Sequence, residues 1–376
     1  MHCCVHVDDI GYTGTEKQAN EFEKEIVVDF KIDLLGRLGQ DPTAKRYLGM
    51  QIDRFPDRFE IHNQDLIDTL LQATEKYNIN KESVPMRDIR LSHVDCPQTD
   101  ADKEAMKQYK YRTVLGQIGW IFLVSRPDLG WAYKECSRFA SNYGRAHWQA
   151  LLKVVGYLKK TRDTHKLVIS RGEGTRLTAS CDADWNGEVD RHLSTTGWIT
   201  FFGDSPISWC SRTQRCTTRS TCESGYASLA SLSQEVIYLQ LLAASLFRPT
   251  SCVTVFAREG TEKQPGCVRT WREYVKQFVS ERATLLSDSA NAIANMKTPP
   301  GWLAEALRHV KTAFHFCKQF FSEGLIGLEH KRGDSLCADI LTKGWGAKSG
   351  SGADTQKSAV FHKHAMQCLG HGASAA

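Results

Sequence analysis

The chain has 376 residues, of which 41% are hydrophobic and 24% are charged, and its formal net charge is +5. This length favours two or three domains with ample material for a core, and the mild basic excess permits a phosphate-bearing partner without demonstrating one. We find no apolar run long enough to span a bilayer and no signal peptide, so neither a membrane protein nor a secreted one is predicted.

The thirteen cysteines are scattered along the chain and include no CxxC pair. An odd number at irregular spacing is typical of reduced thiols and not of a disulfide framework. We therefore expect an intracellular protein, in the cytoplasm or the nucleus.

The first region, 1–110, opens with MHCCVHVDDIGYTG, where an apolar run stops at Asp8 and Asp9 before a glycine-containing turn. Adjacent aspartates on such a hairpin are what a nucleic-acid polymerase uses to hold catalytic metal. A polymerase also needs another aspartate and a template-gripping domain, and the sequence has neither before this hairpin. The elements expected next are a strand at 47–55, a helix at 63–77 and a loop at 86–105.

The second region, 111–170, has helical periodicity. Its apolar residues fall three and four apart and make one stripe: Trp148, Leu151, Leu152, Val155 and Leu158. Before this stripe, Pro127 is expected to start a helix that has Asp128 in its first turn. The pattern predicts a helical connection between the first region and the third.

The third region, 171–344, begins with strands and then alternates strands with helices. The expected strands lie at 176–183, 196–202, 206–210, 284–288 and 325–330, and the expected helices at 220–245, 289–296, 304–322 and 334–342. This order implies an α/β (α+β) fold with a mixed sheet flanked by helices. Residues 248–283 do not fit it and read as an insert, and residues 345–376 read as a disordered tail because they are rich in Gly, Ser, Ala and Lys.

Four acidic residues stand at informative places in the third region. Asp182 ends the first strand, Glu223 starts the long helix, Asp288 ends the buried strand and Asp339 lies in the final helix. If the first and fourth strands are neighbours, their two aspartates come off adjacent strand ends. Converging carboxylates repel one another, and hard divalent ions such as Mg²⁺ compensate their charge. Two ions about 4 Å apart could then clamp a phosphodiester, although each acid alone also fits a helix cap or a solvated position.

Several longer stretches are more specific than these single residues. They are SCDADWNG, STTGWITFFGDSPISWCSRTQ, TRSTCESGYASL, LLSDSANAI, RHVKTAFHFCKQFFSEGLIGLEH and ADILTKG. In this order and spacing, apart from the insert, they resemble the ribonuclease H domain of copia-type retrotransposon Pol polyproteins. The second region is similar to the segment before that domain, and HVDDI and YLGMQI resemble the end of the reverse-transcriptase palm. The resemblance covers about 1–344.

This resemblance implies a ribonuclease H-like five-stranded mixed sheet that cleaves the RNA strand of an RNA–DNA hybrid with two Mg²⁺ or Mn²⁺ ions. The family's metal-binding acids fall on Asp182, Glu223, Asp288 and Asp339. The residues expected to touch the hybrid backbone are Arg212, Arg215, Arg219 and Lys343, which equally fit a solvated face. The implied partners are the hybrid itself and the missing polymerase portion or other retroelement proteins, and no membrane is expected.

The departures from the family define the alternatives. Asp8 and Asp9 are expected to be a remnant without polymerase activity, because the third carboxylate of that site is absent. Gly225 replaces a usual Glu at a helical position, which lowers the expected efficiency. The chain could therefore be an inactive relic that binds nucleic acid, or a fragment of a longer polyprotein. The tail contains four residues at a spacing similar to that of zinc ligands: His362, His364, Cys368 and His371. We expect this spacing to be due to chance.

Overall fold

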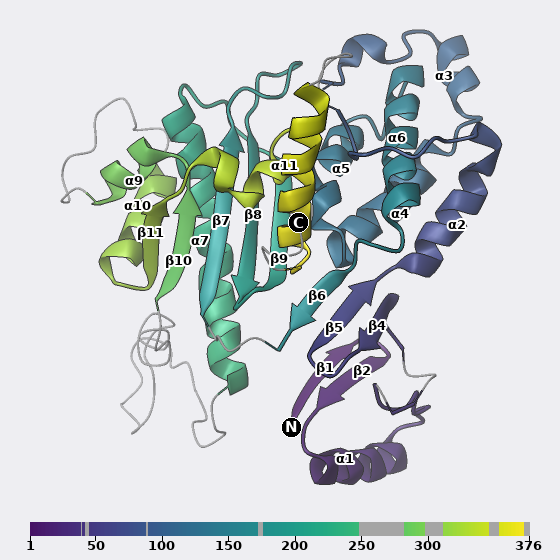
Figure 1. Cartoon of the computed structure of the whole chain (residues 1–376), viewed down its shortest axis with the longest axis vertical. Coiled ribbons are helices and arrows are strands. Elements are labelled where there is room, and N and C mark those ends of the chain that lie inside the picture. Colours follow the sequence, from purple (N-terminus) through teal and green to yellow (C-terminus); the bar gives the residue numbers. More distant parts are fainter. Residues whose placement is uncertain are drawn as a thin grey trace.

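The computed structural model describes residues 1–38, 40–41, 45–87, 89–171, 176–247, 282–297, 311–345 and 353–371. Within these ranges the strands form a two-stranded sheet (β1-β2), a four-stranded sheet (β3-β4-β5-β6) and a five-stranded sheet in the order β11-β10-β7-β8-β9. A group of helices lies beside the five-stranded sheet, and the N-terminal hairpin lies at the far end of the molecule (Figure 1).

The predicted N-terminal hairpin is confirmed. Strand β1 (His2–His6) pairs antiparallel with β2 (Asp9–Thr13), and α1 (Glu16–Asp29) follows. The helix begins at a capping box, in which Thr15 accepts from the N–H of Gln18 and the Gln18 side chain reaches back to the N-cap backbone. The hairpin is largely exposed.

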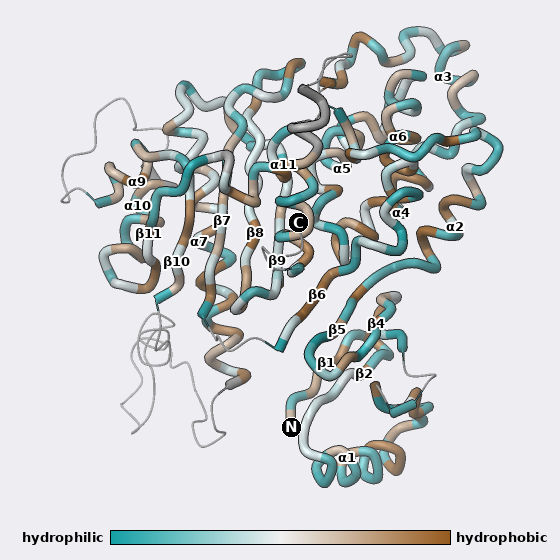
Figure 2. Tube along the Cα trace, in the orientation of Figure 1, coloured by the Kyte–Doolittle hydropathy of each residue, from teal (hydrophilic) through white to brown (hydrophobic). Residues whose placement is uncertain are grey.

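The four-stranded sheet joins distant parts of the chain. It contains β3 (Arg46–Tyr47), β4 (Met50–Arg54), β5 (Arg58–His62) and β6 (Leu167–Ser170). The single strand expected at 47–55 is divided at Leu48 and Gly49, which both have positive φ. Strand β6 begins with three apolar residues, brown in Figure 2, and ends at Ser170; it pairs antiparallel with β5, Leu167 opposite Ile61.

The helical periodicity of the second region corresponds to three helices, α4 (Tyr111–Val124), α5 (Gly130–Ser137) and α6 (Arg145–Thr161). Two further helices, α2 (Gln64–Thr74) and α3 (Asp100–Met106), lie in the first region. The predicted stripe of α6 is buried at Trp148, Leu151, Val155 and Leu158, whereas Leu152 is half-buried. A short 3₁₀ turn, Pro127–Leu129, leads into α5 as expected.

The prediction of a loop over 86–105 is wrong where α3 forms. The side chain of Thr99 accepts from the N–H of Asp102 and so caps the helix. The polar composition of this segment concealed a surface helix.

The five-stranded mixed sheet also agrees with the predicted fold. Its strands are β7 (Leu177–Asp184), β8 (Thr195–Phe202), β9 (Ser205–Thr213), β10 (Ala283–Ser287) and β11 (Ile326–His330). Strands β7, β8 and β9 form the antiparallel meander, and β10 runs parallel to both β7 and β11. The insert predicted at 248–283 and the start of the helix predicted at 304–322 lie mostly outside the described residues.

Alternate residues of the sheet face two different layers. Cys181 and Trp198 pack with a layer formed by α7 (Thr221–Phe247), α9 (Ala290–Lys297) and α10 (Lys311–Ser322). Ile199 and Phe201 pack on the other face, against the 3₁₀ turn η6 (Cys337–Leu341) and the core of the helical region. This period of two is what a sheet covered on both faces requires.

Helix α7 is, by length and composition alone, apolar enough to cross a membrane, contrary to the expectation that no run is long enough. Its residues Tyr226, Leu229, Leu232 and Val236 are completely buried in the core that it shares with the sheet. Packing as a core helix accounts for its apolar composition.

The prediction of a disordered tail over 345–376 is wrong for residues 353–371. Helix α11 (Ala353–Cys368) stands between the sheet and the helical region (Figure 1). Phe361, Ala365 and Cys368 fall four and three apart and are buried in the shared core. The low-complexity residues before the helix hid this short apolar stripe.

Candidate functional site

Two of the predicted acids come off neighbouring strand ends. Ser287 of β10 pairs in parallel with Cys181 of β7, so Asp288 and Asp182 occupy the next position on each strand. Asp182 is 3% exposed, whereas Asp288 is exposed at the surface. The strand adjacency on which the sequence argument depended is therefore present.

Glu223 lies in the first turn of α7 and is buried. Its carboxylate accepts from the backbone N–H of Arg219 at 2.7 Å, and its own N–H donates to Ser220 Oγ at 3.2 Å. A side chain at Gly225 would come within 2.8 Å of Ser289 Oγ. The glycine that departs from the family pattern therefore lets the start of α7 approach the residue that follows Asp288.

Asp339 belongs to η6, which crosses the sheet on the opposite face from α7. The Lys343 ammonium group forms an ion pair with Asp339 and lies 3.9 Å from Asp182 Oδ2. The Thr342 hydroxyl donates to the Asp182 carboxylate. A Cβ at Gly197 would lie 2.6 Å from Thr342 Cγ2, so the turn can cross β8 because that strand carries a glycine there.

The charges of these residues influence one another. Burial, and then the neighbouring Asp182 charge, raise the pKa of Asp339 to about 7, and Lys343 opposes this rise. Although the Asp288 residue is exposed overall, partial burial of its carboxyl group, and then the Asp182 charge, raise its pKa. Burial alone would lower the pKa of Lys343, but Asp182 and Asp339 outweigh it and raise that pKa. Asp182 thus lies within electrostatic reach of both Asp339 and Asp288.

The donor chemistry of this edge fits a hard divalent cation, because carboxylate oxygens are the preferred ligands of Mg²⁺. Among the described residues, however, no group of three or more His, Cys, Asp or Glu side chains is arranged so that it could hold a metal ion. The positive charge near Asp182 and Asp339 is supplied by Lys343.

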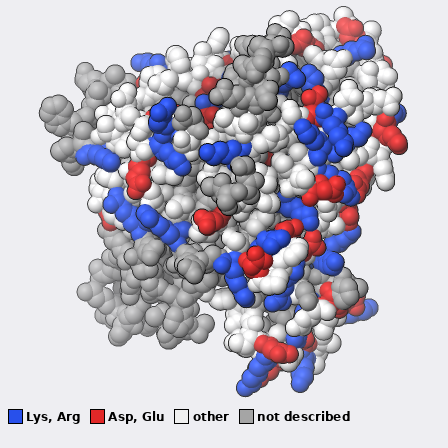
Figure 3. Space-filling view, viewed as in Figure 1, with Lys and Arg blue, Asp and Glu red and all other residues white. Residues whose placement is uncertain are grey.

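The predicted basic residues have different environments. Arg212 donates to Ser231 Oγ of α7 at 2.7 Å, while Arg215 and Arg219 are exposed on the turn that precedes that helix. Lys343 is engaged with the acids and is not purely a surface cation. On the face drawn in Figure 3, basic and acidic side chains are interspersed. Phosphate binding on this face would therefore depend on a few basic side chains and not on a large positive surface.

Sequence reasoning missed one residue at this edge. The Trp185 side chain is 43% exposed and follows Asp184 at the end of β7. Its Nε1–H donates to the carbonyl oxygen of Thr218 at 3.1 Å, which ties the end of β7 to the arginine-bearing turn. The available signal was an aromatic residue three positions after Asp182.

The other sequence candidates lie away from the sheet edge. Asp8 and Asp9 are exposed at the tip of the N-terminal hairpin. In the C-terminal segment, His364 and Cys368 are buried side chains of α11, and His371 Nε2 lies 3.0 Å from the carbonyl oxygen of Lys166. These tail residues are packing groups of an ordered helix and its end.

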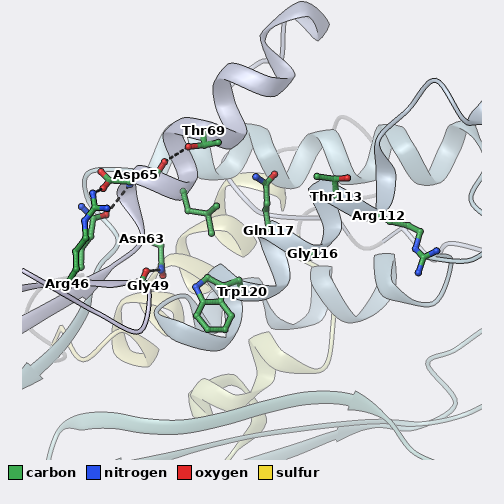
Figure 4. A pocket seen from close by; sticks show the side chains of 12 residues that line it. Arg46, Gly49, Asn63, Asp65, Thr69, Arg112, Thr113, Gly116, Gln117 and Trp120 are labelled. Atoms are coloured by element: carbon green, nitrogen blue, oxygen red, sulfur yellow. Dashed lines mark hydrogen bonds and ion pairs between the residues drawn. The ribbon is translucent and has the colours of Figure 1, made fainter. Parts of the chain in front are cut away.

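A depression with a volume of ≈ 680 Å³ lies between β4, α2 and α4, away from the acidic residues (Figure 4). Arg112, Gly116 and Trp120 follow each other four residues apart along α4 at its rim, and Arg46 pairs with Asp65 on the other side. Basic and aromatic side chains along a groove are typical of surfaces that bind nucleic-acid strands. Sequence analysis did not identify this surface, because its lining comes from four separate elements, β3, β4, α2 and α4.

Comparisons with known proteins place this geometry in context, although no family model matches the chain. The retrovirus-related Pol polyprotein from transposon TNT 1-94 of Nicotiana tabacum is 28% identical over 90% of this chain and 23% of its own length. The polyprotein from transposon RE2 of Arabidopsis thaliana is 24% identical over 91% of this chain and 21% of its own. Secreted RxLR effector protein 161 of Plasmopara viticola is 37% identical over 36% of this chain and 94% of the effector.

The chain therefore spans less than a quarter of the length of the polyproteins that it matches. Among solved structures, a foamy viral protease-reverse transcriptase in complex with an RNA/DNA hybrid is 11% identical with a TM-score of 0.42. That match covers 88% of this chain and 35% of the viral one.

Proposed function

We propose that the chain is a reverse transcriptase and ribonuclease H-like region of a copia-type retrotransposon Pol polyprotein, and that its five-stranded sheet cleaves the RNA strand of an RNA–DNA hybrid. The observation that carries this proposal is the parallel pairing of β7 and β10, which brings Asp182 and Asp288 to one sheet edge. Asp339 and Glu223 approach the same end from opposite faces of the sheet.

In this proposal Asp182, Glu223, Asp288 and Asp339 hold Mg²⁺ or Mn²⁺. When bound, two such ions supply an activated water and stabilise the leaving oxygen of the phosphodiester. The remaining work of the chain is to position the hybrid. Trp185 and the exposed Arg215 and Arg219 flank the acids and suit contacts to the ribose and phosphate backbone.

The test is cleavage of a labelled RNA–DNA hybrid by the 376-residue chain in Mg²⁺, Mn²⁺ or EDTA. We expect metal-dependent cutting of the RNA strand alone, and its loss in Asp182→Asn and in Asp288→Asn. Asp8→Asn is the matched control, because it makes the same change at the exposed hairpin. Cutting by Asp182→Asn at the parent rate would show that the site is assigned wrongly.

A second candidate is a protein that binds the hybrid without cleaving it. Two observations favour it. Lys343 forms an ion pair with Asp339, and among the described residues no three His, Cys, Asp or Glu side chains are arranged so that they could hold a metal ion. Tight hybrid binding by folded protein with no cutting in either metal supports this candidate and excludes the first.

A further inference from the structure

We infer that Lys343 is the counter-ion of Asp182 and Asp339 when no metal is bound. Its ammonium group occupies the cation position between the two carboxylates and must move away before a divalent cation binds there. The inference deepens the proposed function, since it concerns the same site. It assigns to this lysine control over metal binding, in place of the contact with the nucleic-acid backbone that the sequence suggested.

The first argument is the position of the charged group. Lys343 Nζ is ion-paired with Asp339 and 3.9 Å from Asp182 Oδ2. An ammonium group has three donors and no acceptor, so it cannot share a metal site as a ligand. A divalent ion that binds these carboxylates would face a like charge a few ångströms away, and the two cations therefore compete.

The second argument is the contrast in exposure. The side chains of Asp182 and Asp339 are 3% and 8% exposed, whereas that of Lys343 is 42% exposed. The lysine therefore reaches buried carboxylates from a position open to solvent. Its flexible stem allows the ammonium group to move outward without unfolding any element.

The third argument is that the backbone beside the lysine is fixed. Thr342 is buried and donates to Asp182, and Ser211 Oγ donates to the carbonyl oxygen of Leu341 at 2.6 Å. Gly197 provides the space in which this turn sits. The carboxylates and the turn can thus stay in place, and the exchange involves one side chain.

The charge balance explains why such a residue is useful. Buried carboxylates without compensation are strongly unfavourable, so a metal-free site of this kind destabilises the fold. Lys343 supplies one positive charge to two buried acids, and Arg90 pairs with the nearby Asp184 at 2.9 Å. The lysine thereby stabilises the metal-free protein and raises the metal concentration at which the site fills.

The experiment measures Mg²⁺ binding to the full chain by titration calorimetry and thermal unfolding in EDTA. For Lys343→Gln we expect affinity for Mg²⁺ to rise about tenfold, because the competing charge is gone, and the unfolding temperature in EDTA to fall. Lys343→Arg keeps the charge and is expected to keep the weaker binding. Lys153→Gln, an exposed change on α6, is the control for net charge.

Unchanged or weaker Mg²⁺ binding by folded Lys343→Gln would overturn the inference, as would the absence of measurable Mg²⁺ binding in both parent and variant. Neither readout depends on hybrid cleavage. A protein that shows the expected change in affinity but cuts no hybrid therefore supports the counter-ion role while it contradicts the proposed activity.

Discussion

At the scale of single residues, Asp339 is the clearest case of a side chain whose protonation is set by its neighbours. Its pKa is raised to about 7, chiefly by burial and then by the charge of Asp182. A carboxyl group with a raised pKa binds its proton more tightly in the folded protein than in the unfolded chain. Its contribution to stability is present below the unfolded pKa, near 4, and is lost as the pH rises through about 7.

We therefore expect the free energy of unfolding of the parent in EDTA to fall, relative to Asp339→Asn, between about pH 4 and pH 7. Urea unfolding of both proteins across that range measures the difference. Carboxylates with a lowered pKa, such as Asp128, lose their contribution at lower pH and do not obscure this window. A difference that stays constant with pH would contradict the assignment.

Single glycine residues also determine how closely two segments of backbone can approach each other. Gly197→Ala would push a Cβ against Thr342 and Leu341, and we expect it to destabilise the protein by about 1–3 kcal/mol. Gly116→Ala, on the exposed face of α4 with no neighbour within 4 Å, is expected to stabilise by up to about 1 kcal/mol. Urea unfolding compares the two, and equal effects would show that the close approach at β8 is unimportant.

At the scale of elements, α11 adds side chains to the core that the five-stranded sheet shares with the helical region. Phe361 is 1% exposed in the core that includes η6 and the helical region. We expect Phe361→Ala to cost about 3–5 kcal/mol, since it leaves a cavity the size of a ring. Lys363→Ala, on the exposed side of the same helix, is expected to change stability by less than about 0.5 kcal/mol.

Chemical unfolding of both α11 variants is the measurement. Similar small changes for the two would mean that the helix does not pack as described.

Most helices and strands could be predicted from the sequence, because the spacing of apolar residues and the positions of turn residues indicated the same boundaries. Strands β7 to β11 carry apolar residues bounded by turns, and their order was sufficient for the fold. The sequence also predicted that Asp182 and Asp288 are adjacent, because strand ends are defined by local pattern. The partnership of Lys343 with the acids, and the roles of Gly197 and Trp185, could not be predicted, since they depend on contacts between elements far apart in the chain.

At the scale of the whole molecule, the helical region and the five-stranded sheet share one core. One hydrophobic cluster contains Tyr111 and Leu151 of the second region together with Ile199 and Leu341 of the third. The core therefore crosses the boundary predicted between these regions near residue 170. Charged groups reinforce this contact. Arg138, which follows the last residue of α5, pairs with Glu135 and, across the boundary, with Glu188, and both carboxylates are fully buried.

Arg138→Met should cost about 3–5 kcal/mol, because it removes the buried cation that Glu135 and Glu188 share. Arg191→Met removes another partner of Glu188, but that arginine side chain is 60% exposed, so we expect less than about 1 kcal/mol. Urea unfolding monitored by tryptophan fluorescence measures both. Equal decreases in the free energy of unfolding for the two variants would contradict the special role of the buried Arg138 side chain.

The pairing of β6 with β5 has a consequence for how the protein forms during synthesis. Arg58 lies opposite Ser170, so the fourth strand of that sheet is made more than a hundred residues after the third. A ribosome adds residues from the N-terminus onward at about 5–20 per second, so β5 waits several seconds with an unpaired edge. Exposed edges of this kind recruit other strands. The nascent chain is therefore most vulnerable to aggregation before residue 170 has emerged.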